Sequence, residues 1–202
     1  MIRVETADRT TTLTLDRPDK VNALTEAMLR DLVTAVHDAR DAAALILTGT
    51  GKVFSAGADL DAARAGLATS PLWEELSAAI AAHPGLTLAA LNGTVAGGAN
   101  GMVLACDLRI GVPWAKFFYP VMKLGYLPQP SDPVRMAALI GPARTKWMLL
   151  AGQKMDTDQA LNCGLIDEIV DGDALMERAH ALCADCVAAD PGTAQAIKGL
   201  CQ

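Results

Sequence analysis

The sequence lacks the segments that direct a protein into a membrane or across one. No apolar run reaches the roughly 20 residues that a membrane-spanning helix requires. The first residues, Met-Ile-Arg-Val-Glu, do not follow the pattern of a signal peptide. We therefore expect a cytoplasmic protein that has no membrane partner.

Cysteine and histidine are too few, and wrongly spaced, for a disulfide framework or a metal centre. The chain has 5 cysteines and 3 histidines. Its CxxC pair, Cys183 and Cys186, has no second pair and no histidines at zinc-ligand spacing. We interpret the pair as two reduced positions on one helix and expect no bound metal. A serine nucleophile elbow is also absent, because Ser55 has Val53 where that motif needs glycine.

Positive charge is in deficit. The chain carries 17 lysines and arginines against 23 aspartates and glutamates, a formal net charge of −6. This balance argues against nucleic acid or an anionic membrane as a partner. Hydrophobic residues make up 51% of the 202 residues and charged residues only 20%. That composition predicts a globular protein with one domain and a substantial core.

Glycine, by contrast, is concentrated where the chain is expected to pass from strand to helix. The apolar run 86–91 predicts a buried strand, Asn92-Gly93 ends it, and Gly97-Gly98 opens a segment of helical composition that reaches Cys106. Glycines at a helix start allow another group to approach the backbone closely. The first amides of a helix have no intrahelical acceptor and lie at the positive end of its dipole. This stretch therefore suits a developing negative charge, as an oxyanion hole does.

A second stretch of the same kind follows the apolar strand expected at 44–47. Residues 54–60, Phe-Ser-Ala-Gly-Ala-Asp-Leu, again place small residues at a strand-to-helix turn and can present another backbone donor. Together with residues 15–24, Leu-Asp-Arg-Pro-Asp-Lys-Val-Asn-Ala-Leu, these stretches resemble the enoyl-CoA hydratase/isomerase (crotonase) superfamily. The resemblance extends from about Thr11 to Val170, with the three motifs in the family's order.

The resemblance implies an α/β fold, the crotonase-type spiral of ββα units. We expect one domain over residues 1–202, in which residues 1–170 form the ββα core and residues 171–202 begin the C-terminal helical region. Family members normally continue with helices that cover the active site and build a trimer, so we expect this region to be truncated. The family also implies a homo-oligomer, a trimer or hexamer, although the short C-terminus weakens that prediction.

Local patterns predict where the main elements begin and end. Apolar spacing indicates a helix over about 25–40, and Ser70-Pro71 begins another with an apolar face. Asp156, with Gln159 three residues later, has the pattern of a capping box for a helix that Gly164 ends. Further elements are expected as a helix from Pro142 to Gly152, a strand at 165–170 and a helix at 173–189.

The family's oxyanion hole maps onto two backbone amides of this chain. By resemblance, the N–H groups of Ala58 and Gly98 polarise the thioester carbonyl of an acyl-CoA and stabilise the enolate formed from it. The same resemblance places CoA along the two turns, with contacts from Asn22, Ala23, Ala56, Asp59 and Leu60. Asp59 is in addition expected to cap a helix. An acyl-CoA would be the substrate, and no separate cofactor is implied because CoA is part of it.

The acid and base groups of the family are missing. A hydratase of this family uses two glutamates, whose positions are Gly101 and Val121 here, and neither residue can transfer a proton. The isomerase branch needs one carboxylate, whose position in Leu124-Gly-Tyr-Leu-Pro-Gln129 is held by Gln129. Glutamine forms hydrogen bonds but does not titrate near neutrality. The dehalogenase branch places its nucleophilic aspartate at that same position, so it is missing as well.

Asp132 is the nearest remaining carboxylate in the sequence. If buried beneath the acyl pocket it could act as a base or nucleophile, whereas Pro133 directly after it favours a helix cap. The cap is the interpretation we favour. Tyr119 and Tyr126 could orient a water or a substrate oxygen, or simply pack.

Three functional hypotheses remain. The first is an acyl-CoA enzyme of hydratase/isomerase type with an unidentified acid or base, and it is our working hypothesis. The second is a non-catalytic relative that binds CoA esters or a protein partner. The third is an unrelated α/β nucleotide-binding domain built on Gly97, Gly98 and Gly101. That spacing is not GxGxxG, and no acidic residue ends a strand about 20 residues later, as a dinucleotide site needs.

Overall fold

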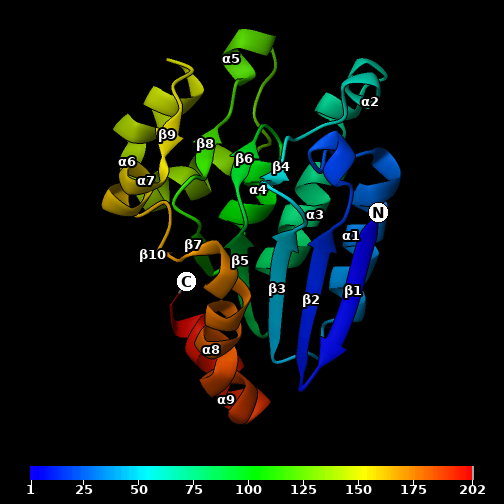
Figure 1. The fold of residues 1–202 in the computed structure, drawn as a ribbon, viewed down its shortest axis with the longest axis vertical. Coiled ribbons are helices and arrows are strands. Elements are labelled where there is room, and N and C mark those ends of the chain that lie inside the picture. The colour runs from blue at the N-terminus through cyan, green and yellow to red at the C-terminus, as the bar shows by residue number, and fades with distance from the viewer. Residues whose placement is uncertain (202) are drawn as a thin grey trace.

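Apolar runs of the sequence form the central strands of a large sheet. The computed structural model describes residues 1–201 (Figure 1). Strands β2 (Thr10–Leu15), β3 (Ala44–Gly49) and β5 (Leu86–Leu91) are almost entirely buried. Their near-continuous burial is typical of parallel strands that are covered on both faces. The predicted strands at 44–47 and 86–91 are thereby confirmed.

Two sheets make up the β structure of residues 1–201. The six-stranded sheet has the order β1-β2-β3-β5-β7-β10 and the four-stranded sheet the order β4-β6-β8-β9. Pairing is parallel throughout except for β1 with β2 and β8 with β9, which are antiparallel. The strands not yet given are β1 (Ile2–Ala7), β4 (Val53–Ser55), β6 (Thr94–Ala96), β7 (Leu108–Gly111), β8 (Lys116–Phe118), β9 (Met155–Asp156) and β10 (Glu168–Ile169).

The chain alternates between the two sheets in repeated ββα turns. Strand β3 of the large sheet leads to β4 of the small sheet and then to helices, and the pairs β5–β6 and β7–β8 repeat this path. Equivalent strands pair in parallel, so each turn stacks on the one before it (Figure 1). The predicted α/β spiral of ββα units is confirmed. The helices of these turns are α2 (Leu60–Arg64), α3 (Leu72–Ala81), α4 (Ala99–Leu104), α5 (Val121–Leu124) and α6 (Asp132–Leu149).

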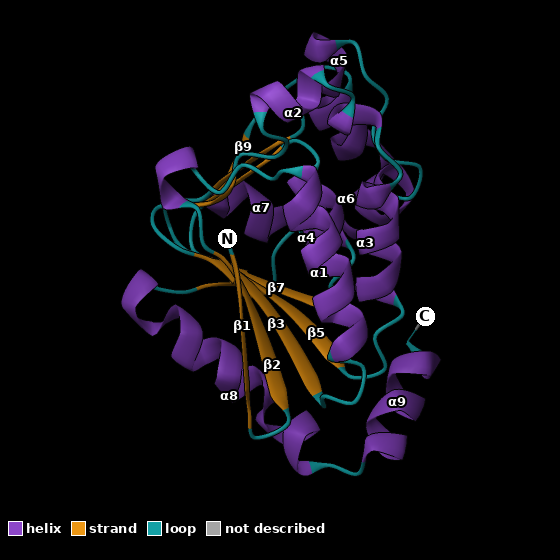
Figure 2. Ribbon diagram, turned by 90° about the vertical axis from the view of Figure 1, so that its right-hand side faces the viewer, coloured by secondary structure: helices purple, strands orange, loops and turns teal. Residues whose placement is uncertain are grey.

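Helices cover both faces of the large sheet. Helices α1 (Glu26–Asp38), α3 and α4 lie on one side, and α8 (Leu175–Ala188) lies on the other (Figure 2). Most buried hydrophobic side chains of both sheets and these helices form one contiguous core. The remaining helices are α7 (Thr157–Cys163), α9 (Pro191–Leu200) and the 3-10 turns Pro18–Lys20, Leu67–Thr69 and Gly172–Ala174.

Helix ends follow the sequence closely where local capping decides them. Thr25 caps α1 by accepting from the Met28 amide, and Asp156 and Gln159 form the expected capping box of α7. The helix expected to begin at Pro142 is part of α6, which starts at Asp132. Gly141 has φ 75° inside α6, so the element is two helical segments joined at a glycine break.

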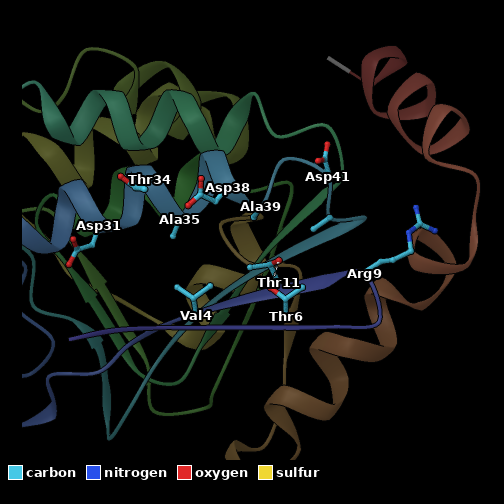
Figure 3. Close-up of a pocket in the computed structure, with 11 residues that line it drawn as sticks. Val4, Thr6, Arg9, Thr11, Asp31, Thr34, Ala35, Asp38, Ala39 and Asp41 are labelled. Atoms are coloured by element: carbon cyan, nitrogen blue, oxygen red, sulfur yellow. Dashed lines mark hydrogen bonds between the residues drawn. The ribbon is translucent and has the colours of Figure 1, made fainter.

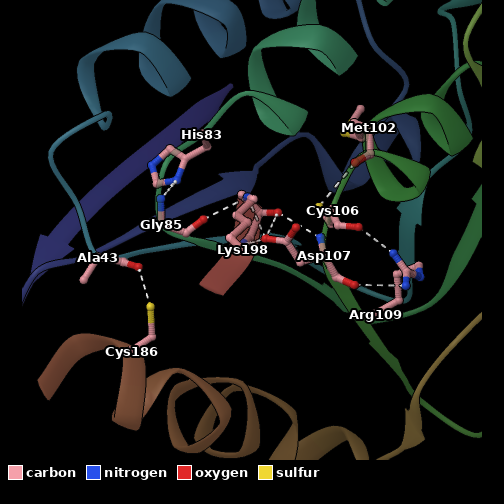
Figure 4. Close-up of polar contacts among 10 residues, drawn as sticks. Ala43, His83, Gly85, Met102, Cys106, Asp107, Arg109, Cys186 and Lys198 are labelled. Atoms are coloured by element: carbon pink, nitrogen blue, oxygen red, sulfur yellow. Dashed lines mark hydrogen bonds and ion pairs between the residues drawn. The ribbon is translucent and has the colours of Figure 1, made fainter. Parts of the chain in front are cut away.

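The amino ends of the parallel strands hold a dense polar network (Figure 4). Lys198 of α9 donates to Asp107 Oδ2 at 2.7 Å and to the Gly85 carbonyl at 2.9 Å. Arg109, only 3% exposed, donates to the carbonyls of Leu165, Cys106 and Asp107. These contacts fasten α9 and the strand ends to one another.

Two further properties of the described chain bear on its possible partners. In residues 1–201 no helix is both long and apolar enough to span a lipid bilayer. The same residues contain no group of three or more His, Cys, Asp or Glu side chains that could hold a metal ion.

Candidate active site

The two glycine turns predicted from the sequence pack directly against each other. Gly57 and Gly97 both have positive φ, 86° and 55°. A Cβ on Gly57 would lie 2.8 Å from the Ala96 carbonyl oxygen and 3.3 Å from the Gly97 Cα. Only glycine fits this approach without a shift of the backbone. The close contact brings the residues that follow each turn, Ala58 and Gly98, to one place.

The amide of Ala58 takes no part in the pairing that holds its turn. Leu24 accepts from the Asp59 amide and donates to the Gly57 carbonyl, both at 2.8 Å. Leu24 and Ala58 form a parallel bridge, but its hydrogen bonds come from Gly57 and Asp59, the residues on either side of Ala58. The N–H and the carbonyl of Ala58 take no part in them. Its side chain is half-buried at the edge of a cavity. The Ala58 N–H is therefore free to donate to a bound ligand.

Gly98 stands at the N-cap of α4, where the backbone N–H lies outside the helical hydrogen-bond ladder. Its neighbour Gly97 donates to the Phe118 carbonyl and accepts from the Asn100 amide, which holds the turn in place. A Cβ on Gly98 would lie 3.1 Å from the ring of Trp73. That indole is itself fixed by a 2.8 Å hydrogen bond to the Leu67 carbonyl. Gly98 is thus held against a rigid aromatic wall.

Both amides border one cavity of about 310 Å³. Its lining combines the two glycine turns, the start of α2 and the segment after β8. Val121 and Gln129, the positions of the second hydratase glutamate and of the isomerase carboxylate, also border it. The structure therefore brings together Ala56, Ala58, Leu60, Gly98 and Gln129, all of which the sequence singled out.

A larger cavity of about 620 Å³ lies between the β1–β2 hairpin and α1 (Figure 3). Exposed Asp31, Asp38 and Asp41 line it, and it contains no strand-to-helix glycine turn. Arg9 lines it too, and its guanidinium donates to the carbonyls of Val187 and Ala189. A surface with these three carboxylates repels the phosphates of CoA. Size alone therefore does not identify the site.

The turn expected to hold CoA is braced by an ion pair. Arg17 donates to Asp59 Oδ2 at 2.8 Å and to the Ala23 carbonyl at 2.9 Å. Asp59 also caps α2, because its Oδ1 accepts from the Asp61 and Ala62 amides. The Arg17 hydrogen bond and these amides hold the pKa of Asp59 below its usual range. Asp59 thus acts as the predicted cap, and its carboxylate is already engaged within the protein.

Asn22, which the resemblance assigns to the CoA turn, uses its side chain within the protein. Its side chain is fully buried and donates to the carbonyls of Thr50 and Val53, while its Oδ1 accepts from the Arg17 amide. Its backbone is left-handed, with φ 53°, a conformation that asparagine tolerates well. These internal contacts show that the Asn22 side chain shapes the turn. Ala56 and Leu60, by contrast, are exposed and border the cavity.

Asp132 is not the helix cap that the sequence pattern favours. The N-cap of α6 is Ser131, and Asp132 is the first residue inside the helix, with its carboxylate fully buried. Tyr119 donates to Asp132 Oδ2 at 2.9 Å, and Oδ1 has no hydrogen-bond partner in the described residues. A Cβ on Gly101 would lie 2.9 Å from that Oδ1 atom. The aspartate thus fills the space left by the missing side chain at position 101.

Burial is the largest single influence on the pKa of Asp132. Burial, opposed by the Tyr119 hydrogen bond and by Arg135 and assisted by Glu74, raises the pKa of Asp132 from 3.8 to about 6. Burial and the neighbouring Asp132 raise the pKa of Tyr119 well above its usual value. The sequence offers no signal for this pair, because Tyr119 and Asp132 are 13 positions apart and α5 lies between them.

Comparisons with known proteins identify the family of this chain. The family model described as enoyl-CoA hydratase/isomerase matches residues 5–201. The chain is 37% identical over 175 residues to a probable enoyl-CoA hydratase of Rhodobacter capsulatus, covering 84% of this chain and 68% of that protein. It is 34% identical over 190 residues to the probable enoyl-CoA hydratase echA8 of Mycobacterium tuberculosis, covering 89% and 72%.

Solved structures show the same fold. Pseudomonas aeruginosa DspI superimposes with a TM-score of 0.91 at 31% identity, over 100% of this chain and 86% of that one. An enoyl-CoA hydratase from Bacillus anthracis superimposes with a TM-score of 0.91 at 27% identity, over 98% of this chain and 81% of that one. The spiral of ββα units and its paired glycine turns define a protein of the crotonase fold. By sequence, the chain belongs to the enoyl-CoA hydratase/isomerase family.

Proposed function

We propose that this protein processes acyl-CoA thioesters by stabilising an enolate in an oxyanion hole formed by the amides of Ala58 and Gly98. One observation carries the proposal: two backbone donors that have no acceptor among residues 1–201 border the same cavity, on turns that touch each other. Donors of this kind need no rearrangement when charge develops on the thioester oxygen. Family membership supports the choice of substrate class.

The cavity offers a path for the rest of the substrate. The CoA portion would run past Ala56 and the 75% exposed Leu60, on the turn that the Arg17–Asp59 ion pair braces. The exposed Arg64 lies at this edge of the cavity and would attract the phosphates of CoA. The acyl chain would extend toward Val121 and Gln129, where the Gln129 amide can orient a polar acyl substituent.

A second candidate function is binding without turnover. The observation that favours it is the lining itself, because no Asp, Glu or His occurs among the described residues that border the cavity. A protein of this kind would hold a CoA ester, or a protein partner, without moving a proton.

The test is a spectrophotometric assay with a 2-enoyl-CoA and a 3-enoyl-CoA, combined with calorimetric titration of the same compounds. Conjugated thioester absorbance falls on hydration and rises on isomerisation toward the 2-enoyl form. Enzyme-dependent change with either compound supports the acyl-CoA enzyme. Binding without change favours the second candidate, and the absence of binding by both compounds contradicts both functions.

We also propose that the protein is a homo-oligomer. Several apolar side chains on and between α5 and α6 are exposed in the single chain, which is costly for a monomer in water. They are Met122, Leu124, Leu127, Val134 and Leu150. Sedimentation velocity would give the mass of a trimer or hexamer if the proposal holds, and the mass of one chain if it does not.

A further inference from the structure

The cavity contains few side chains that can carry a proton. Among the described residues that border it, the titratable ones are Arg64, Tyr119 and Tyr126. Arginine stays protonated under all ordinary conditions, so it cannot accept a proton. Tyr126 is 40% exposed, whereas Tyr119 is 3% exposed and bonded to a buried acid. The two tyrosines therefore have very different surroundings.

Tyr119 connects the cavity to a carboxylate that does not itself reach it. Tyr119 borders the cavity, and its hydroxyl donates to Asp132 Oδ2 at 2.9 Å. Asp132 is fully buried and lies behind Tyr119, at the start of α6. A proton that arrives at the Tyr119 oxygen can therefore be passed on, because the hydroxyl proton already points at an acceptor.

Asp132 keeps capacity to accept that proton. Its Oδ1 has no hydrogen-bond partner in the described residues and lies close to Gly101, because a Cβ at position 101 would be 2.9 Å from Oδ1. A buried carboxylate is normally satisfied on both oxygens, and an unsatisfied one costs stability. A buried acid of this kind beside a cavity is a candidate functional group.

Charges from two elements surround this carboxylate. Glu74 of α3 faces it and accepts from the Ser131 amide and hydroxyl, while Arg135 of α6 donates to that hydroxyl at 2.7 Å. Glu74 disfavours ionised Asp132, and Arg135 favours it. Tyr119 faces Asp132 from the segment between β8 and α5.

We propose that Tyr119 is the catalytic residue that removes and returns the proton at C2 of the acyl-CoA, with Asp132 as the positioning residue that accepts and returns the hydroxyl proton of Tyr119. This inference rests on the proposed function. The C2–H bond breaks and its proton goes to the Tyr119 oxygen, as the tyrosine's own proton moves to Asp132 Oδ2. The electron pair forms the C1=C2 bond of the enolate, whose oxygen accepts from Ala58 and Gly98. The reverse transfer restores the thioester.

The surroundings of Tyr119 make the two transfers concerted. Burial and the nearby carboxylate disfavour a tyrosinate, so the hydroxyl cannot lose its proton before it receives another. The effective base is then Asp132, although it touches no substrate. The arrangement supplies to the cavity the acid and base that Gly101, Val121 and Gln129 lack.

Deuterium exchange tests the proposal without assuming a particular overall reaction. Wild-type protein is incubated with butyryl-CoA in D2O, and incorporation at C2 is followed by NMR and mass spectrometry. We expect Tyr119→Phe and Asp132→Asn each to slow exchange by about 100-fold or more, the usual contribution of a general acid or base. Asp31→Asn, the matched control, neutralises an exposed carboxylate that does not border this cavity and should slow exchange by less than about threefold.

The pH profile separates a proton-transfer role from a structural one. Exchange by the wild type should rise with pH through an inflection near pH 6, where Asp132 ionises, and the Asp132→Asn profile should lack that inflection. Unchanged exchange in Tyr119→Phe and Asp132→Asn, with active wild type, would overturn the pair but leave the acyl-CoA function intact. No exchange by a wild type that binds butyryl-CoA would overturn the pair alone. A wild type that neither binds nor exchanges would overturn the proposed function as well.

Discussion

The polar groups at the amino ends of the large sheet's strands and those near the carboxyl ends of the small sheet's strands differ in how far they are paired. At the amino ends of the strands, Asp107 accepts from Lys198 and from the Thr87 amide and hydroxyl, and Arg109 donates to three carbonyls. At the carboxyl ends, the amides of Ala58 and Gly98 have no acceptor in the described chain, and Asp132 Oδ1 has no donor there.

The difference between the ends distinguishes structural from functional polarity. Paired groups stabilise the fold, whereas buried groups without partners lower stability and need a reason to persist. Both ends hold charged and polar residues, so polarity alone does not locate a site. Unused hydrogen-bonding capacity next to a cavity locates it at the carboxyl end.

The largest effect is expected from removing one of the two unused donors. Gly98→Pro abolishes the N–H, and turnover of any thioester should fall about 100- to 1000-fold, or roughly 3–4 kcal/mol. Gly98→Ala is the matched control, because it keeps the N–H but places a similar Cβ 3.1 Å from Trp73. Steady-state kinetics of both variants gives the comparison. Equal loss in the two would mean that packing against Trp73, not the amide, matters.

Asp132→Asn should stabilise the protein in a pH-dependent manner. The folded pKa of Asp132 is raised from 3.8 to about 6, so the folded state binds its proton more tightly than the unfolded state. The wild type therefore loses stability as pH rises from about 4 through 6, by about 3 kcal/mol in total. The Asp132→Asn variant has no ionisable group at this position, so its stability does not fall in this way. Urea unfolding at pH 4 and pH 8 should give similar stabilities at pH 4 and a more stable variant at pH 8, and a constant difference would contradict the account.

A substitution at the amino ends of the strands, where the polar groups are paired, should reduce stability and leave thioester turnover unchanged. Lys198→Met removes two hydrogen bonds of a largely buried ammonium, at a cost of about 2 kcal/mol, while Asp107 keeps its contacts with Thr87. Thermal unfolding would measure this loss of stability. Lys20→Met, at an exposed lysine, is the control. A matched loss of thioester turnover by folded Lys198→Met would break the distinction between the two ends.

The smallest effect is expected from adding a carboxylate to the cavity. Gln129 is 9% exposed and borders the cavity at the isomerase position, so Gln129→Glu should add a low rate of 3-enoyl to 2-enoyl isomerisation. The gain is small because Tyr119 and Asp132 already occupy the neighbouring space. The rise in conjugated thioester absorbance measures it, with Gln129→Met as the uncharged comparison. A variant that binds the 3-enoyl-CoA normally and isomerises it no faster would contradict the assignment of position 129.

The sequence predicts the fold and the site well where the physics is local. Gly57 and Gly97 mark strand-to-helix turns, and the patterns around them point to the amides of Ala58 and Gly98. Capping patterns likewise predict the ends of α7. The spiral fold follows from three motifs in order, two of which lie directly after buried strands.

The sequence predicts poorly where residues distant in the chain decide the outcome. Asp132 precedes a proline and so has the local pattern of a cap, but the empty space at Gly101 and the hydroxyl of Tyr119 draw its carboxylate inward. The motif around Asn22 likewise does not reveal that carbonyls 28 and 31 residues later accept from its side chain. Patterns along the chain carry no information about such partners.

The most direct test of the central claim is infrared difference spectroscopy of bound butyryl-CoA that carries ¹³C at the thioester carbonyl. If the amides of Ala58 and Gly98 donate to that oxygen, the carbonyl stretch shifts to lower frequency on binding. Gly98→Ala should keep most of the shift, and Gly98→Pro should lose about half of it. A bound carbonyl that absorbs at the frequency of free butyryl-CoA would contradict the oxyanion hole.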